Sequence, residues 1–472
     1  MKVLAINVCL RPSIDYIMFP IGLAYVASAI QRAGHDIHLV DLDAHRRSDS
    51  ELRALLKEGD FDVAAFGCIV TGYRIVKDLS KTVRDARKDA VIVAGNSVAD
   101  SIPELLLSRT EVDIAVLGEG DVTIVELLDA LENSRPLDNV RGICFKKNGM
   151  ISCTPRREAI KDIDSIPSPN WELFDVESYV RRGIGAVPEP YPMPRDQIRP
   201  FWINTARGCP FNCSFCYHVF KKDGYRFRSP ESILREIRAL QEEYRINYFA
   251  FNDELTFFSK HQAEEFVDRL LESGLEFYWN ADIRANLFTE GDLKLLEKIK
   301  ESGCVGFGYS LESADAHILE SMNKHIEVDH FVRQAKALEK AGLASWTSLV
   351  LGYPDENPET LKRTFGVCYD LNIYPSSGYL LPQPGTPMYA LAKKKGLIAD
   401  DEEYLLRIGD RQDFTLNFTK MSDEEFQGEV KKHLKRIADK LGLALAEGKL
   451  LKTGHYRSKE SAPETHTRAE DR

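Results

Sequence analysis

Three cysteines stand close together in the chain, at Cys209, Cys213 and Cys216. Thiolates at this spacing can bind one metal centre from a single loop. The next cysteine along the chain is Cys304, so the loop offers no fourth thiol. A centre held by three ligands keeps an open coordination position, at which a substrate-like ligand can bind. The alternative is a zinc site that takes His218 as its fourth ligand.

Two polar side chains, Tyr217 and His218, directly follow the last of these cysteines. They are candidate catalytic residues, because they could face a substrate near the metal centre and deliver a proton to it. The imidazole of His218 suits this role because its ordinary pKa lies near neutral pH. The alternative for both residues is packing against the cysteine loop.

The cysteine loop follows the first strand of a series in which strands and helices alternate. We predict six strands, at 201–205, 248–252, 277–281, 305–310, 344–351 and 377–381. Most are followed by a helical pattern, at 230–244, 260–273, 290–302 and 331–341. Six βα units are too few for an eight-stranded barrel. The spacing therefore predicts a partial (β/α)6 barrel over residues 200–390, open on one side.

Three cysteines in the pattern CxxxCxxC after the first strand of such a barrel resemble the radical S-adenosylmethionine (radical SAM) superfamily. In that family the cysteines hold a [4Fe-4S] cluster, and S-adenosylmethionine chelates the fourth iron through its amino and carboxylate groups. Reductive cleavage of the sulfonium then yields a 5′-deoxyadenosyl radical. The resemblance implies these roles for Cys209, Cys213 and Cys216.

The resemblance extends to motifs on the later strands, which appear in the family's order. Asp253 and Glu254 follow the second strand, where family members place polar residues for the amino group of S-adenosylmethionine. Alternatives for these two are a helix cap or a substrate contact. Arg284 ends the third strand, where the family often has an arginine that faces the cofactor carboxylate.

Two further strands carry segments that the family places beside the cofactor. Glu312 and Ser313 follow the fourth strand, in the segment whose acidic residue and serine approach S-adenosylmethionine. Gly352 follows the fifth strand and resembles the turn beside the adenine. The loop after the sixth strand, Pro382-Gln383-Pro384-Gly385, matches a loop common in the cobalamin-associated branch of the family.

The N-terminal segment, residues 1–135, also alternates strands with helices. We predict strands at 3–8, 36–40, 63–68, 91–94 and 114–117, with helices such as 22–33 and 75–89 between them. This alternation indicates βαβ units around a parallel sheet. The fold class is therefore α/β, with a doubly wound, Rossmann-like domain before the barrel.

A Rossmann-like domain followed by this barrel resembles the cobalamin-binding branch, as do Pro20-Ile21-Gly22-Leu23 and Gly118-Glu119-Gly120. The chain departs from the branch at Ala94-Gly95-Asn96-Ser97, where members usually have a Gly-Gly-x-His loop. A corrin would bind at the carboxyl ends of the strands, near a switch point in strand order. Six residues would line this crevice: Gly67, Cys68, Thr71, Gly95, Asn96 and Gly118. The alternative is a domain kept for architecture or substrate binding.

Three other segments complete the expected organisation. Residues 136–199 are rich in proline and read as a hairpin, at 142–151, followed by a linker. Residues 391–452 read as helical, and residues 453–472 as a disordered tail. The polar run Gly409-Asp410-Arg411-Gln412-Asp413 is either a substrate clamp or a salt-bridged turn.

The composition narrows the classes of function. The net charge of −11 argues against a general nucleic-acid binder. No apolar run approaches the roughly 20 residues that cross a bilayer. The N-terminus lacks the pattern of a secretory signal, so we expect a cytoplasmic protein. In that reducing environment most of the nine cysteines should be unpaired.

We therefore expect an enzyme that uses the radical on a small-molecule substrate, with cobalamin-dependent methylation of an unactivated carbon as the leading outcome. The alternative reaction is dehydration, cyclisation or rearrangement of a sugar, lipid or tetrapyrrole without methyl transfer. A metal-binding regulatory scaffold is the alternative outside enzymology. The radical chemistry requires a low-potential electron donor such as a flavodoxin or ferredoxin.

Overall fold

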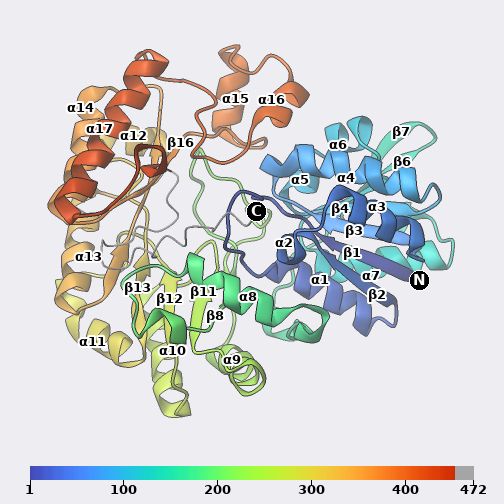
Figure 1. Ribbon diagram of the computed structural model, residues 1–472, viewed down its shortest axis with the longest axis horizontal. Coiled ribbons are helices and arrows are strands. Elements are labelled where there is room, and N and C mark those ends of the chain that lie inside the picture. The colour runs from blue at the N-terminus through green and yellow to red at the C-terminus, as the bar shows by residue number, and fades with distance from the viewer. Residues whose placement is uncertain (452–472) are drawn as a thin grey trace, which may run out of the picture.

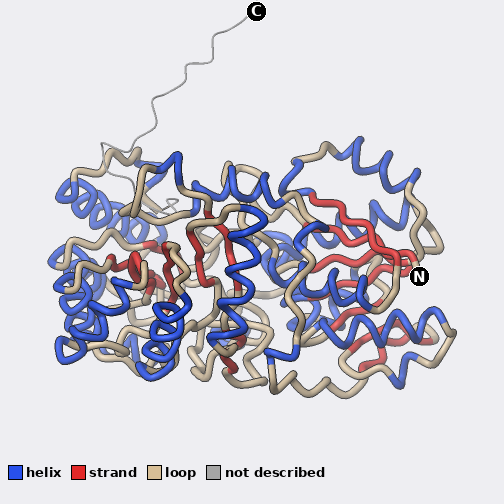
Figure 2. Tube along the Cα trace, turned by 90° about the horizontal axis from the view of Figure 1, so that it is seen from below, coloured by secondary structure: helices blue, strands red, loops and turns tan. Residues whose placement is uncertain are grey.

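The computed structural model describes residues 1–451, so the expected tail at 453–472 lies outside the described residues. The chain forms two α/β lobes (Figure 1). The N-terminal lobe is built on a seven-stranded sheet, and the second lobe is a partial barrel whose strands belong to two smaller sheets. Figure 2 shows the strands of each lobe surrounded by helices. The expected α/β class is confirmed.

The N-terminal sheet has the strand order β2-β1-β3-β4-β5-β6-β7, and its first five strands are parallel. These strands are β1 (Lys2–Asn7), β2 (Asp36–Asp41), β3 (Val63–Gly67), β4 (Val91–Gly95) and β5 (Ile114–Val116). The order reverses between β1 and β3, and such a switch point leaves a crevice at the carboxyl ends of the strands.

Helices cover both faces of this sheet because its strands are apolar on both sides. On one face, Val3 and Val63 pack with α1 (Ile21–Arg32) and α7 (Gly120–Glu132). The opposite face packs against α3 (Asp49–Glu58) and α4 (Tyr73–Ala86). The short helices α2 (Leu42–His45), α5 (Asn96–Ser101) and α6 (Pro103–Arg109) complete the lobe.

The predicted hairpin forms and belongs to the sheet rather than to the linker. β6 (Ile143–Lys147) pairs antiparallel with β5, and β7 (Met150–Cys153) pairs with β6. The turn between them holds Asn148 and Gly149 at positive φ, as a tight hairpin turn requires. A disulfide joins Cys144 to Cys153 across the pair. The other seven cysteines are free.

The barrel lobe consists of a five-stranded parallel sheet and a two-stranded continuation. The first contains β8 (Pro200–Ile203), β11 (Tyr248–Phe251), β12 (Tyr278–Asp282), β13 (Cys304–Gly308) and β14 (Ala344–Trp346). The second contains β15 (Ser348–Leu351) and β16 (Ser376–Tyr379). The strand predicted at 344–351 is thus divided at Thr347. A bridge from Glu312 to Leu349 joins the two sheets.

Helices cover the outside of the barrel, and side-chain caps define their starts. Ser229 caps α9 (Pro230–Tyr244), and Ser259 forms a capping box at α10 (Lys260–Ser273). The remaining barrel helices are α11 (Leu293–Glu301), α12 (Ala316–Ser321), α13 (Val328–Lys340) and α14 (Pro358–Asp370).

The linker and the C-terminal region connect the lobes. After α8 (Val176–Gly183), the linker sends Val187 and Ile198 into a cluster with the barrel residues Tyr248 and Val305. The C-terminal helices are α15 (Pro387–Lys394), α16 (Asp401–Arg407) and α17 (Asp423–Leu441). The hydroxyl of Tyr73 on α4 donates to Glu402 on α16 at 2.9 Å, which joins the C-terminal region to the N-terminal lobe.

No helix within residues 1–451 is long and apolar enough to cross a membrane.

Candidate active site at the mouth of the barrel

The three cysteines lie on a loop whose two ends are held together. β9 (Ala206–Arg207) pairs with β10 (Arg226–Phe227) at the base of the loop. At this neck Gly208 has φ +85°, and a Cβ there would lie 2.3 Å from the carbonyl oxygen of Gly224. Only glycine fits this close approach. The backbone therefore closes the cysteine loop into a compact unit.

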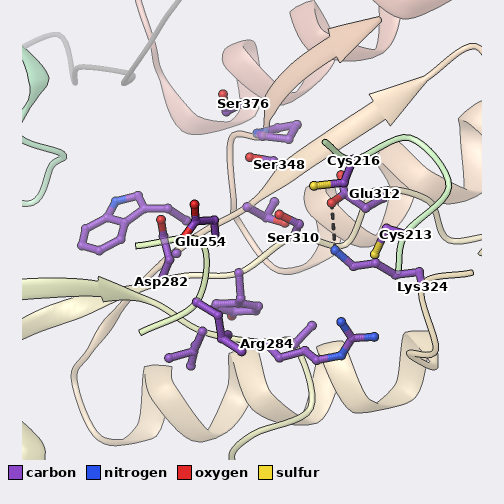
Figure 3. Close-up of a pocket in the computed structure, with 18 of the residues that line it drawn as sticks. Cys213, Cys216, Glu254, Asp282, Arg284, Ser310, Glu312, Lys324, Ser348 and Ser376 are labelled. Atoms are coloured by element: carbon purple, nitrogen blue, oxygen red, sulfur yellow. Dashed lines mark hydrogen bonds and ion pairs between the residues drawn. The ribbon is translucent and has the colours of Figure 1, made fainter. Parts of the chain in front are cut away.

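All three cysteines line one cavity of about 400 Å³ at the mouth of the barrel (Figure 3). Within residues 1–451, no three Cys, His, Asp or Glu side chains are grouped so as to hold a single metal ion. A four-iron cluster does not need such a group, because each thiolate binds a different iron. The set Cys209, Cys213 and Cys216, on one loop and at one cavity, suits an iron-sulfur cluster.

His218 does not join the cysteines at this cavity. Its Nδ1 atom is buried and has no hydrogen-bond partner in the described part of the chain. Burial, with a smaller effect of Lys221, lowers the pKa of His218 to about 4. The neighbouring Tyr217 also lies outside the cavity lining, and its hydroxyl donates to Asp100 in the N-terminal lobe at 2.5 Å.

Arg284 lines the cavity and has spare hydrogen-bonding capacity. Its guanidinium lies over the ring of Phe211, 3.5 Å from the ring centroid, and one nitrogen donates to the carbonyl oxygen of His325 at 3.3 Å. Its Nε is buried with no partner in the described structure. Burial lowers the pKa of Arg284, although the group stays cationic. An anionic ligand would satisfy this side chain.

Glu312 and Lys324 form a buried ion pair in the same cavity (Figure 3). The Nζ of Lys324 donates to Oε1 of Glu312 at 2.8 Å. The second carboxylate oxygen, Oε2, is buried and unpartnered among residues 1–451. The backbone of Glu312 has φ +62°, a strained conformation for a residue other than glycine. The sequence motifs do not identify Lys324.

The neighbours Asp253 and Glu254 have different environments. Glu254 lines the cavity, accepts a hydrogen bond from the backbone N–H of Gly208 at 3.2 Å, and has a pKa raised by burial. Asp253 lies outside the lining. It accepts from Thr205 Oγ1 at 2.6 Å and from the backbone N–H of Ala206 at 3.0 Å. These contacts favour a structural role for Asp253, which anchors the end of β8.

Ser313 and Gly352 also lie outside the cavity lining. The Ser313 side chain is fully buried and contacts the hydroxyl of Thr364 at 3.4 Å. Gly352 has φ +101°, and its N–H donates to the carboxylate of Glu356. Burial raises the pKa of Glu356 to about 7. Both predicted residues thus shape the strand ends around the site.

A polar wall of the cavity was not predicted. It includes Asp282, Ser310, Ser348 and Ser376, which lie around the cavity in Figure 3. Burial raises the pKa of Asp282 to about 6, with a smaller contribution from the charge of Asp253. These groups offer hydrogen bonds to a polar ligand inside the barrel.

The polar run at 409–413 packs beside this wall. Arg411 donates to the hydroxyl of Ser376 at 3.0 Å, and Asp410 forms an ion pair with Arg11 at 2.9 Å. The run is therefore a salt-bridged turn that also supports a residue of the cavity.

The residues predicted to line a corrin crevice lie at the carboxyl ends of β3, β4 and β5. Gly67, Thr71, Gly95 and Gly118 are partly exposed there, and Asn96 is exposed with φ +65°. Asparagine tolerates a positive φ better than most residues, so Asn96 can stand in this turn where glycine would otherwise be expected.

Cys68 departs from this group. Its side chain is buried under the 3₁₀ turn η1 (Val70–Gly72), where a Cβ on Gly72 would lie 2.1 Å from its sulfur. Burial raises the pKa of Cys68 to about 12. Cys68 therefore supports the turn from below rather than lining the crevice.

Two large apolar side chains are exposed at the same edge. Met18, in the connection between β1 and α1, is 38% exposed, and Ile69, just after β3, is 41% exposed. β1 and β3 are the strands of the switch point. Exposed apolar side chains at this point suit a flat, largely apolar ring, so the residues present fit a corrin.

Comparisons with known proteins agree with this geometry. Residues 203–368 match the family model of the radical SAM superfamily, and residues 8–128 match the B12 binding domain. The uncharacterized methyltransferase PH0819 of Pyrococcus horikoshii is 30% identical over 384 residues, which cover 80% of this chain and 79% of that protein. The anaerobic magnesium-protoporphyrin IX monomethyl ester cyclase of Cereibacter sphaeroides is 26% identical over 395 residues, which cover 82% of this chain and 62% of that protein.

Solved structures share the fold. The radical S-adenosylmethionine methyltransferase TsrM from Kitasatospora setae, with cobalamin and a [4Fe-4S] cluster bound, superposes with a TM-score of 0.67 and 18% identity. The match covers 84% of this chain and 78% of that chain.

Proposed function

This chain belongs to the radical SAM superfamily, in the branch that carries a B12-binding domain, and on that premise we propose that it methylates an unactivated carbon of a small-molecule substrate. The [4Fe-4S] cluster and S-adenosylmethionine are the cofactors of the family, and cobalamin is the ligand of the domain. One observation carries the proposal. The cavity lined by the three cysteines also holds Arg284 and Glu312, each with one buried polar atom that has no partner among residues 1–451. The cysteine loop is hydrogen-bonded to the carboxyl edge of the N-terminal sheet through Tyr217 and Asp100.

The cavity side chains have the chemistry to bind an amino acid cosubstrate. Arg284 has a free buried donor, and its planar guanidinium is suited to a carboxylate. Glu254 and the free oxygen of Glu312 are acceptors for the N–H groups of the cosubstrate's amino group. Lys324 donates to the other oxygen of Glu312 and so orients this carboxylate. We assign these four residues to S-adenosylmethionine.

The cysteine loop would hold the cluster, which supplies the electron that cleaves S-adenosylmethionine into the radical that abstracts hydrogen. Cobalamin, when bound at the sheet edge, supplies a methyl group for the substrate. The protein's own contribution is to orient the cosubstrate and to surround the cavity with apolar walls such as Leu255 and Ile283, which limit side reactions. A flavodoxin or ferredoxin is the partner we propose as electron source.

Product analysis tests the proposal. The protein is purified anaerobically, reconstituted with iron, sulfide and hydroxocobalamin, and incubated with methyl-labelled S-adenosylmethionine, dithionite and a metabolite extract. We expect 5′-deoxyadenosine and S-adenosylhomocysteine in comparable amounts, with label in a small molecule. Formation of 5′-deoxyadenosine without S-adenosylhomocysteine would contradict methyl transfer and favour a dehydration, cyclisation or rearrangement.

A further inference from the structure

A hydrogen bond connects the cysteine loop to the N-terminal sheet. Tyr217 directly follows the cysteine at position 216, and its hydroxyl donates to Oδ2 of Asp100 at 2.5 Å. Asp100 lies in α5, which begins directly after β4. This distance is typical of a charge-assisted hydrogen bond between a hydroxyl and a carboxylate. The loop that bears the metal ligands is therefore bound to the edge that bears the corrin crevice.

The carboxylate of Asp100 is oriented by other groups as well. Its Oδ1 accepts from the backbone N–H of Gly118 at 2.9 Å and from Nη1 of Arg156 at 2.5 Å. Its side chain is only 10% exposed. Gly118 belongs to the turn after β5, so the sheet itself aims this carboxylate at Tyr217.

Arg156 holds the same loop at a second place. Its Nη2 donates to the carbonyl oxygen of Val219 at 2.8 Å and to Asp223 at 3.1 Å. Its guanidinium also covers the Gly118 turn, where a Cβ would lie 3.0 Å from Nη2. The loop is thus attached to the sheet edge through both a side chain and its backbone.

The ring of Tyr217 is confined from another side. Gly385, at φ +84°, approaches so closely that a Cβ there would lie 2.8 Å from Cε2 of Tyr217. Three segments distant in sequence therefore meet at this ring: the sheet edge, the cysteine loop and the loop after β16.

Resting on the proposed function, we infer that Asp100 is a positioning residue that fixes the cysteine loop relative to the corrin crevice through Tyr217. A substrate radical must form within reach of the methyl donor, and small misplacements of reacting groups cost large factors in rate. The groups assigned to S-adenosylmethionine lie in the barrel cavity, separate from this contact. Loosening the contact should therefore spare the cleavage of S-adenosylmethionine and impair its coupling to methyl transfer.

The test compares Asp100→Asn and Tyr217→Phe with the wild type, as full-length protein loaded with cluster and hydroxocobalamin. Asn keeps the size of the side chain and loses its charge, while Phe keeps the ring over Gly385. Tyr389→Phe is the matched control, because Tyr389 donates to Asp401 at 2.7 Å within the C-terminal region. Iron content and thermal unfolding establish that each variant is folded and loaded.

Pulsed electron paramagnetic resonance (EPR) measures the dipolar coupling between cob(II)alamin and the reduced cluster. We expect Asp100→Asn and Tyr217→Phe to broaden the distance distribution and to lower the yield of S-adenosylhomocysteine per 5′-deoxyadenosine about tenfold, the effect of one charge-assisted hydrogen bond. The control should match the wild type. Wild-type coupling and product ratios in both variants would overturn the inference. A wild type that forms no S-adenosylhomocysteine would refute the proposed function instead, and the EPR comparison would still decide the inference.

Discussion

Lys324 donates to Glu312 at 2.8 Å inside the barrel cavity, and this contact leaves the other oxygen of the Glu312 carboxylate buried without a partner in the described structure. Glu312 is 4% exposed and Lys324 is 9% exposed. A buried ionised group with unused hydrogen-bonding capacity is costly unless a ligand completes its environment. We therefore expect a ligand that carries a hydrogen-bond donor to bind at this pair.

Replacing Glu312 should weaken the binding of S-adenosylmethionine. In Glu312→Gln the side chain keeps its size, but the amino group of the cosubstrate loses its charged acceptor. We expect the Kd to rise about tenfold, which corresponds to one hydrogen bond to a charged group. Isothermal titration of the reconstituted protein measures it. Arg363→Met, which removes an ion pair with Asp315 outside the cavity, is the control and should leave the Kd unchanged.

Arg284 should recognise the carboxylate of the cosubstrate. Arg284→Met is expected to raise the Kd for S-adenosylmethionine by about tenfold or more. Decarboxylated S-adenosylmethionine provides the comparison, because it lacks the group that Arg284 would bind. It should bind the wild type and the variant equally weakly. A loss of affinity of the same size for both ligands would assign Arg284 to cluster packing instead.

Replacing Asp253 should lower stability, whereas replacing Glu254 should weaken ligand binding. Asp253→Ala removes hydrogen bonds to the end of β8, so we expect the free energy of unfolding to fall by about 2 kcal/mol. Glu254→Ala should leave stability nearly unchanged and weaken the binding of S-adenosylmethionine. Chemical denaturation of the apoprotein and ligand titration of the reconstituted protein measure the two effects. The reverse pattern would assign the cosubstrate contact to Asp253.

Stability should depend on pH through Glu356. Its pKa is raised by burial to about 7, above the ordinary value of 4.5. The folded state therefore holds a proton that the unfolded state releases between these values, so stability falls as the pH rises through this window. Glu356→Gln removes the free-energy cost of ionising this buried carboxyl group. We expect the variant to be more stable than the wild type at pH 8, by at most about 3 kcal/mol, with a much smaller difference at pH 5. Urea denaturation of the apoprotein at the two pH values measures it, and an equal difference at both would contradict the assignment.

Much of the architecture was predictable because it depends on local patterns. The alternation of apolar strands with amphipathic helices predicted both lobes, and the spacing of Cys209, Cys213 and Cys216 identified the loop. The division of the long strand at Thr347 was not predictable. Beside this division Glu312 has a positive φ and bridges to Leu349, which is a contact between distant segments.

The site was predictable only where sequence motifs mark strand ends. Glu254, Arg284 and Glu312 line the cavity. Asp253, adjacent to Glu254, differs because consecutive side chains point in different directions at the end of a strand. Lys324 reaches the cavity from the segment after α12, which no motif links to it, and Asp282 ends β12 without being the residue that the motif marks there, Arg284. Such contacts depend on how distant elements pack together, which the local spacing of residues does not reveal.

We expect Cys209, Cys213 and Cys216 to hold a [4Fe-4S] cluster whose fourth iron binds S-adenosylmethionine. EPR of the anaerobically reconstituted and reduced protein, before and after addition of S-adenosylmethionine, tests it most directly. The cluster signal should change when S-adenosylmethionine is added and should be lost when the three cysteines are replaced by alanine. A protein that carries zinc, or a cluster signal that S-adenosylmethionine leaves unchanged, would contradict it.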